Sequence, residues 1–161
     1  MRGTAIEPRK DRIIQEHVHD TYKLRGKLAE PTACSQCGAV FQGGRWVWAA
    51  KPSGAGETVC PACNRIHDKY PAGVVMLSGA FFDAHGEEIV NLARNEEEKE
   101  KGLHPLHRIM NIEKEKEAVV IFTTDVHLPR RIGEALRSAY EGELNYQYAE
   151  DEKFIRVSWK R

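Results

Sequence analysis

Two short cysteine pairs decide how this chain must fold: Cys34-Ser-Gln-Cys37-Gly38 and Cys60-Pro-Ala-Cys63-Asn64. Two residues separate the cysteines within each pair, and 22 residues separate the pairs. A Cys-x2-Cys turn brings two thiolates to one ion, and two such turns about 15 to 25 residues apart complete a closed tetrahedral site. The sequence therefore predicts one structural Zn2+ ion held by Cys34, Cys37, Cys60 and Cys63.

Other chemistries of the four cysteines stay open at this point. An iron–sulfur cluster uses the same ligands, and spacing alone does not exclude it. Two disulfides are disfavoured, because residues 1–10 are charged from the start and lack the apolar run of a secretion signal, so we expect a cytoplasmic protein. A thioredoxin-type redox pair is normally a single Cys-x2-Cys opening a helix after a strand. Four protein ligands leave no position for water, so hydrolysis at this site is not expected.

Composition places the chain among globular proteins. Hydrophobic residues make up 41% and charged residues 30% of its 161 positions, which is enough to build a core. The longest apolar stretch, residues 72–82, is far shorter than the roughly 20 residues that span a bilayer, so no membrane segment is expected. Net charge is zero, but residues 1–70 hold 11 Lys and Arg against 7 Asp and Glu, an excess of +4 that supports nucleic-acid binding weakly.

The pattern along the chain predicts three regions. They are a basic arm with a short helix near 11–19 (residues 1–33), a four-cysteine zinc ribbon (34–70) and an α+β domain (71–161). Within the ribbon we expect a small antiparallel hairpin, with a strand near 45–49 followed by a turn at 52–56. In the last region the periodicity predicts strands over 73–77, 108–113, 117–122, 143–148 and 154–159, and helices over 87–101 and 126–141, ended by Gly102 and Gly142. This order is ferredoxin-like: a βαββαβ unit with an appended strand, expected as one antiparallel sheet with both helices on one face.

Aromatic and basic residues lie side by side between the cysteine pairs. Trp46 and Trp48 point to the same face of a predicted strand and follow Arg45, an arrangement typical of a platform on which bases stack. A small zinc module has little else to bury, so the two rings also fit a structural core. Both interpretations stay open, and Arg65, just after the second pair, joins the residues expected to contact RNA.

The second predicted helix of the α+β domain begins with two arginines. Arg130 and Arg131 lie in its first turn, where the helix dipole disfavours cations by about 0.3 to 1 kcal/mol each. A phosphate bound near Thr123, Thr124 and His127 would explain them, and so would an ion pair with Glu134 or with a carboxylate on the sheet.

Histidines form two groups, His17 and His19 beside Asp20, and His104 with His107. Either group could build a second metal site, although such clusters are more often hydrogen-bonded turn residues. An enzyme using His104, His107 or His127 is a third hypothesis. No nucleophile with a nearby base, nucleophile elbow or phosphate-binding loop is present in the sequence, so we expect a non-enzymatic protein without a small-molecule substrate.

Several stretches together resemble a family of small bacterial zinc-ribbon proteins. They are the first cysteine pair with Ala39-Val40, Gly44-Arg-Trp-Val-Trp48, Cys60 to Gly73, His104-Pro-Leu-His-Arg-Ile109 and Thr123 to Gly133. The paired cysteine turns and Asp68-Lys-Tyr-Pro-Ala-Gly73 are also distantly similar to the zinc-bearing region of the nuclear export adaptors of the large ribosomal subunit, the nonsense-mediated-decay protein three-like family. This resemblance implies a zinc-dependent protein that binds the ribosome or ribosomal RNA, and in bacteria a translation factor of stress or hibernation. The chain is too short for the adaptors' additional domains, so an export role is not implied.

Two functions are therefore carried forward. The first is a zinc-ribbon protein that docks on ribosomal RNA through the basic arm, the Arg45 to Trp48 strand and the start of the second helix. The second is an adaptor that binds a protein partner through the α+β sheet, with zinc purely structural. Salt dependence separates them, because phosphate contacts release counterions and protein contacts do so much less.

Overall fold

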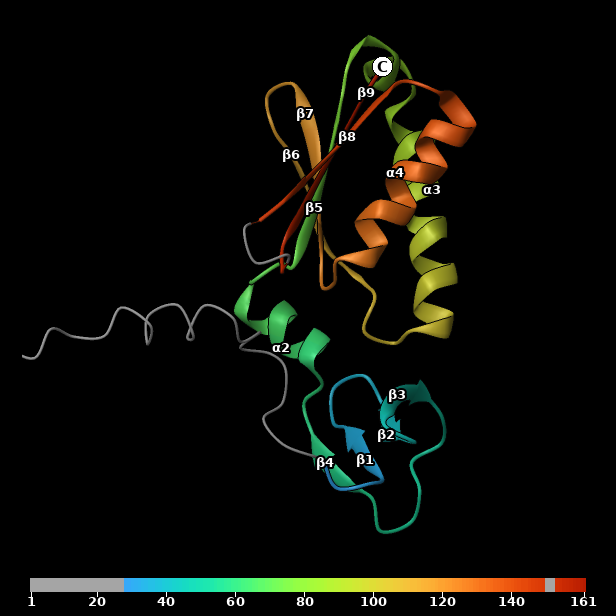
Figure 1. Cartoon of the computed structure of the whole chain (residues 1–161), viewed down its shortest axis with the longest axis vertical. Coiled ribbons are helices and arrows are strands. Elements are labelled where there is room, and N and C mark those ends of the chain that lie inside the picture. The colour runs from blue at the N-terminus through green and yellow to red at the C-terminus, as the bar shows by residue number, and fades with distance from the viewer. Residues whose placement is uncertain (1–27, 150–152) are drawn as a thin grey trace, which may run out of the picture.

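The computed structural model describes residues 28–149 and 153–161. Within these residues it contains three helices and two mixed sheets, which confirms the α+β class. In Figure 1 the larger sheet, with α3 and α4 on one side, lies above the smaller sheet, and α2 lies between them. The helix expected near residues 11–19 falls outside the described residues.

Four short strands around the first cysteine pair form the smaller sheet. They are β1 (Thr32–Cys34), β2 (Ala39–Gln42), β3 (Arg45–Trp48) and β4 (Gly56–Thr58), in the order β3-β2-β1-β4. The hairpin between the cysteine pairs is β2–β3, and it differs from the expected one with a turn at residues 52–56, because β3 pairs with the strand before it and not with β4. Its turn residues, Gly43 (φ 64°) and Gly44 (φ 77°), both have the positive φ of a type I′ turn, and their N–H groups donate to the Glu30 carboxylate.

Helix α2 (Pro61–Asp68) starts inside the second cysteine pair. Cys60 is its N-cap, and Pro61 occupies a first-turn position where its fixed φ suits a helix and its missing N–H costs nothing. The helix ends at Lys69, which adopts the left-handed conformation (φ 54°) and donates its N–H back to the helix. Helix α2 and the strands β1 and β4 are not among the elements that the sequence pattern predicts.

The remaining elements form the larger sheet and its helices. They are β5 (Gly73–Ser78), α3 (Ala80–Leu103), β6 (Ile109–Lys114), β7 (Ala118–Thr123), α4 (His127–Tyr140), β8 (Glu143–Tyr148) and β9 (Ile155–Lys160). This succession of strands and helices is the predicted one. The sheet order, β6-β7-β5-β9-β8, differs from one antiparallel sheet with a strand added at the end. Strand β9 lies between β5 and β8 and pairs with β5 in parallel.

The place of β9 follows from its composition. Ile155, Val157 and Trp159 are fully buried, as expected for a strand with a neighbour on each side. Strand β8 exposes Glu143 and Asn145 and covers only its other face, which suits an edge position. Burying the more apolar strand centrally therefore outweighs keeping the sheet antiparallel.

The long helix α3 begins seven residues before the expected start at Glu87 and passes Gly102, which is helical and does not end it. Its first free N–H groups, on Phe81 and Phe82, donate to the carbonyl oxygen of Arg161 at 2.8 and 3.2 Å. Gly79, with φ 107°, allows this approach, because a Cβ there would lie 2.3 Å from that oxygen. Arg161 thus caps the helix through its backbone, and a kink at His85 follows.

The main core lies between the larger sheet and its two helices. It contains the fully buried sheet residues Val75, Leu77, Ile121, Ile155, Val157 and Trp159, with Ile89 and Ala93 from α3 and Leu128, Ile132 and Leu136 from α4. The second cluster is much smaller. Its buried members are Cys34 and Cys60 with Ala39 and Ala62. The small module, which consists of the smaller sheet and α2 (residues 32–68), therefore depends on something other than apolar burial for its stability.

Candidate metal centre

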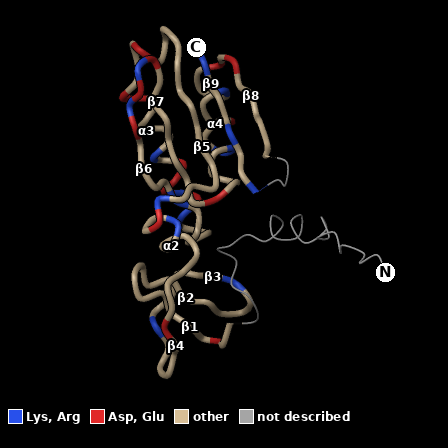
Figure 2. Tube along the Cα trace, turned by 90° about the vertical axis from the view of Figure 1, so that its left-hand side faces the viewer, with Lys and Arg blue, Asp and Glu red and all other residues tan. Residues whose placement is uncertain are grey.

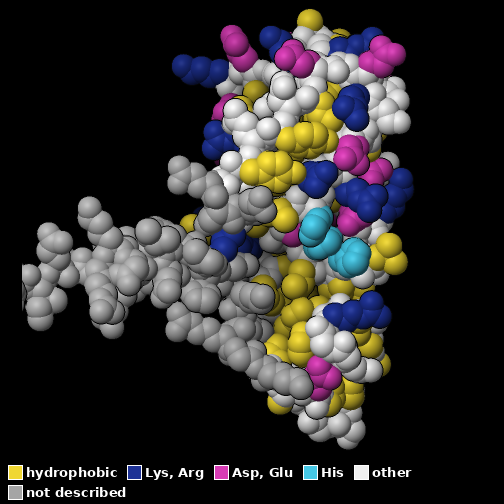
Figure 3. All heavy atoms as spheres, in the orientation of Figure 1, with side chains coloured by type: hydrophobic (Ala, Val, Ile, Leu, Met, Phe, Trp, Pro, Cys, Tyr) yellow, Lys and Arg dark blue, Asp and Glu magenta, His cyan; other side chains and the backbone are white. Residues whose placement is uncertain are grey.

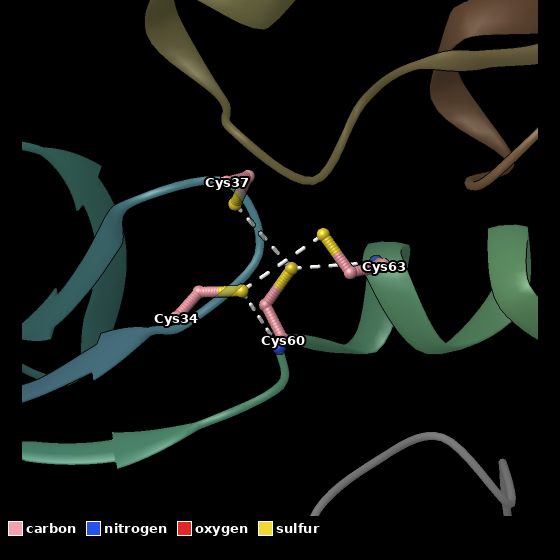
Figure 4. A group of neighbouring side chains, drawn as sticks. All are labelled: Cys34, Cys37, Cys60 and Cys63. Atoms are coloured by element: carbon pink, nitrogen blue, oxygen red, sulfur yellow. Dashed lines mark hydrogen bonds between the residues drawn. The ribbon is translucent and has the colours of Figure 1, made fainter.

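The four cysteines converge between the smaller sheet and α2. Cys34 ends β1 and Cys37 lies in the turn that follows, while Cys60 and Cys63 lie at the start of α2. Figure 4 shows the four sulfur atoms pointing toward a common centre. Gly38 has φ 80°, so the first turn uses the left-handed conformation expected for this glycine.

The distances between sulfur atoms fit one tetrahedral ion. Sγ of Cys34 lies 3.8 Å from Sγ of Cys63, Sγ of Cys37 lies 3.8 Å from Sγ of Cys60, and all four atoms lie within 4.8 Å of one another. A regular tetrahedron of thiolates about 2.3 Å from a central zinc ion has edges of about 3.8 Å. The four cysteines are therefore positioned to bind a metal ion.

The same distances bear on the alternatives. All four cysteines are free, and sulfur atoms 3.8 Å apart are well beyond the bond length of about 2.05 Å in a disulfide. A cluster of several irons lies between its cysteine sulfurs and holds them further apart than a single ion does. The arrangement fits a mononuclear site.

Backbone N–H groups point at the sulfur atoms, as in other tetrathiolate sites. The N–H of Cys60 donates to Sγ of Cys34 at 3.2 Å, and the N–H of Cys63 donates to Sγ of Cys60 at 3.4 Å. Burial works to raise the pKa of Cys34, but backbone hydrogen bonds, including those from Cys37 and Cys60, lower it to about 6. Burial raises the pKa of Cys60 and of Cys63, so in the metal-free protein these two thiols keep their protons at neutral pH.

A buried arginine from the larger unit, the part of the chain that forms the larger sheet and its helices (residues 73–161), completes the site. Arg108 is 7% exposed, and its guanidinium donates to Sγ of Cys63 at 3.3 Å, of Cys37 at 3.1 Å and of Cys60 at 3.4 Å. Its Nε donates to the carbonyl oxygen of Pro105 at 2.6 Å, which fixes the direction of the side chain. Burial works to lower the pKa of Arg108, but the hydrogen bond to Cys63 and the charge that Cys37, Cys60 and Cys63 carry when ionised raise it above its ordinary value, so the side chain stays charged.

Arg108 changes the charge of the centre. Four thiolates around a divalent cation carry about −2, and one guanidinium in contact with three of the sulfurs offsets about half of that. Sequence reasoning missed this residue, because it stands 45 positions from the nearest cysteine it contacts and is only the first residue of a predicted strand. The sole signal was its place in the stretch His104-Pro-Leu-His-Arg-Ile109, which carries part of the family resemblance.

The residues expected to stack on bases are distributed between core and surface. Trp46 is half-buried, packs against the cysteine cluster and lies 5.5 Å from the ring of Phe41, which favours the core interpretation for this ring. Trp48 is 39% exposed, and its Nε1 donates to the carbonyl oxygen of Lys101 at 2.6 Å, a contact between the two units. Arg45 is exposed directly after the hairpin turn.

The other arginines expected to contact RNA also differ in exposure. Arg65 is 7% exposed and its guanidinium donates to the carbonyl oxygen of Tyr70, so its role in this structure is internal. Arg130 is exposed and lies over the ring of Tyr146, 5.8 Å from its centroid. Arg131 is exposed, and its Nε lies 3.4 Å from Oε1 of Glu100. The ion pair of Arg131 is thus made with α3 and not with Glu134 or the sheet.

The start of α4 is already occupied by a carboxylate. The N–H groups of His127 and Leu128 donate to Oδ2 of Asp125 at 2.8 and 3.1 Å. The hydroxyls of Thr123 and Thr124 donate to the carbonyl oxygens of Asp125 and Leu106. The groups expected to meet a phosphate therefore bind within the protein, and only the arginine side chains remain for an outside anion.

The fold and the centre define an α+β protein with a four-cysteine metal site. Comparison of the chain with protein-family models, curated proteins and solved structures gives no match. Among residues 28–149 and 153–161, no helix has both the length and the apolar character needed to cross a membrane. His17, His19 and Asp20 lie outside these residues, whereas His104, His107 and His127 come together and are considered below.

Proposed function

We propose that the chain is a non-enzymatic zinc-ribbon protein that binds RNA and associates with the ribosome. Four thiolates and tetrahedral spacing are the ligand set and geometry that structural zinc prefers, and with four protein ligands no position is left for a substrate. The ion has a structural role in this proposal: it joins two turns whose shared core is too small to hold them together.

The observation that carries RNA binding is the exposure of arginines on both units. Arg45 lies at the tip of the β2–β3 hairpin, and Arg130 and Arg131 lie near the start of α4. An arginine offers a planar set of donors that binds phosphate through two hydrogen bonds. Because Arg108 offsets about half of the charge on the metal centre, the zinc module repels a phosphate backbone less than an isolated tetrathiolate site does.

The arrangement of charge supports the same proposal. Figure 2 shows few charged residues on the strands β1 to β4, and the carboxylate of Glu30, which lies at the turn before Arg45, already accepts the N–H groups of Gly43 and Gly44. The first 70 residues carry the excess of +4, most of it in the arm that precedes the described residues. The ribosome as the source of the RNA, and a role in stress or hibernation, rest on the resemblance to the bacterial zinc-ribbon family and the export adaptors.

Density-gradient sedimentation tests the proposal. Lysate is sedimented at low and at high salt, and the chain is located among the ribosomal fractions. We expect cosedimentation at low salt and release at high salt. For purified RNA, the R45A and R130A variants should each lower the slope of log affinity against log salt by about one, whereas R94A, an exposed arginine on α3, should leave it unchanged. Binding that is indifferent to salt and to R45A and R130A would show that these side chains do not meet phosphate.

A specific observation also favours the adaptor as the second candidate. On the sheet face opposite α3 and α4, the central strands carry the half-buried side chains of Met76 and Phe122 beside the buried Val74 and Val120. Next to Phe122 a cavity of about 300 Å³ is lined by residues such as Met110 and Ile66. An apolar partner there would give an association that persists at high salt and after ribonuclease treatment, which is the opposite outcome of the sedimentation experiment.

A further inference from the structure

A second group of metal-binding side chains lies where α3 ends. Glu100 and His104 are four residues apart, so they share one face of the last turn, and His107 follows in the loop before β6. Each of the three offers a ligand atom, and these atoms lie within 4.8 Å of one another. In Figure 3 histidine side chains lie beside acidic and basic ones about midway down the visible face.

The imidazole of His107 is held as the imidazole of a metal ligand usually is. Its Nδ1 lies 3.2 Å from Oε2 of Glu100, on the side of the cluster, and its Nε2 lies 3.5 Å from Oδ2 of Asp125 on the other side. A histidine that binds a metal through one nitrogen commonly donates the N–H of the other to a carboxylate, which fixes the tautomer and the ring. Asp125 is in the position of that carboxylate.

The carboxylate of Glu100 is also oriented by a neighbouring side chain, that of Arg131. Its Oε1 lies 3.4 Å from Nε of Arg131, which leaves Oε2 toward His107. The side chains of Glu100 and His107 are only 12% and 17% exposed, so protein atoms and not water surround most of their surface. His104 is exposed, and its ring lies tilted by 30° to that of His107, with the two centroids 4.6 Å apart.

A buried carboxylate oxygen in the same place calls for positive charge. Oδ1 of Asp125 is buried and has no hydrogen-bond partner among the described residues, although the side chain is 11% exposed overall. Buried carboxylate oxygens are normally paired, because water or a cation must replace the lost hydration. The imidazole of His107 lies against the other oxygen, Oδ2, so a divalent ion bound to the far side of the ring would add positive charge beside this carboxylate without contacting Oδ1.

We propose that Glu100, His104 and His107 bind a second metal ion, a divalent first-row transition ion such as Zn2+ or Co2+. Two imidazoles and one carboxylate suit these ions and do not suit Mg2+ or Ca2+, which prefer oxygen ligands. Three protein ligands leave at least one position open, and the exposed His104 puts that position within reach of solvent. This second site thus differs from the closed cysteine centre and stands independently of what the chain binds.

The experiment uses the full-length chain with its cysteine site filled by zinc, which is then titrated with Co2+. A second ion bound by nitrogen and oxygen gives weak cobalt absorption bands without the intense sulfur-to-cobalt charge-transfer band of a thiolate site. We expect one such additional ion per chain, and its count is checked by metal analysis after desalting. A titration that adds no ion beyond the cysteine site would overturn the proposal.

Substitutions locate the ion. H104N removes an exposed ligand with little risk to folding and should weaken binding more than about 100-fold, since even outer-shell changes cost about 10- to 100-fold. D125N keeps a good helix cap at α4. It should weaken metal binding about 10-fold, because Asp125 acts as a positioning residue for the ring of His107. H85N, an exposed histidine on the same helix, and H17N/H19N should leave binding unchanged. Retention of the second ion by H104N, or its loss in H17N/H19N, would place it elsewhere.

Discussion

Replacing Arg108 by methionine removes one buried cation and keeps most of the volume of its stem. The wild-type guanidinium donates to three sulfur atoms at 3.1 to 3.4 Å and to the carbonyl oxygen of Pro105. Because Arg108 is only 7% exposed, water has little access to the site and cannot easily replace the lost N–H donors in R108M. The substitution therefore tests whether the larger unit stabilises the metal centre.

The expected effect follows from the hydrogen bonds and the charge. A hydrogen bond to a charged group contributes about 1.5 to 3 kcal/mol, and part of that sum exists in the metal-free protein as well. We take about 3 kcal/mol as the share specific to the metal-bound form. Since each 1.4 kcal/mol is about tenfold in an equilibrium constant, R108M should bind zinc about 100-fold more weakly. R108K, which keeps the charge without the planar donors, should lie between the two.

Competition with a chromogenic chelator at fixed pH measures the zinc affinity of each variant. R94M, at an exposed arginine on α3, is the matched control and should bind zinc as the wild type does. Far-UV circular dichroism confirms that the variants fold. If folded R108M binds zinc within about threefold of the wild type, the guanidinium does not stabilise the thiolates and the reasoning from charge fails.

Three further predictions concern the metal and the packing around the core. Zinc affinity should rise with pH between about 6 and 8, because burial raises the pKa of Cys60 and Cys63 and zinc must displace their protons. Calorimetry in buffers of different ionisation enthalpy measures the protons released. A zinc affinity that does not depend on pH would contradict this prediction. Chelation should speed amide hydrogen exchange across β1 to β4 by far more than in the strands of the larger sheet, and equal exchange with and without zinc would mean that the small module folds unaided. G133A should destabilise the chain by about 1 kcal/mol, because its Cβ would lie 2.9 Å from Leu144 and the overpacking cost exceeds the gain in helix propensity. G102A, also helical but with open space around it, should stabilise the chain by about 0.5 kcal/mol, and denaturant unfolding in which both variants shift the same way would refute the packing argument.

The ligand set and most of the larger unit could be predicted because their signals are local. Cysteine spacing depends on a turn of four residues, and strand and helix periodicity depends on each segment burying one face. Gly142 has φ 90° and directly follows the end of α4 and its cap, as expected for a helix stop. Gly102 had the same local signal but is itself helical, and α3 ends one residue later, at Leu103.

What could not be predicted depends on contacts between distant parts of the chain. The start of α3 is capped by the carbonyl oxygen of Arg161, which lies 80 positions after Phe81. The place of β9 beside β5 depends on which of the last two strands is the more apolar. The three apolar residues Ile155, Val157 and Trp159 of β9, compared with the polar outer face of β8, were a usable signal. The role of Arg108 had no signal of this kind, since nothing in a single arginine indicates which anion it meets.

The loop between α3 and β6 connects the two parts of the molecule through consecutive residues. His107 faces Glu100 and Asp125 on one side, and Arg108 faces the cysteine sulfurs on the other. The backbone of Arg108 is itself fixed, because its N–H donates to the hydroxyl of Thr124 and its carbonyl accepts the N–H of Thr124. A thiolate centre with a charge of about −2 would be costly to bury alone, and so would a buried guanidinium without an anion. Each unit therefore supplies the charge that the other needs, and this contact joins a module with little apolar core of its own to the larger unit.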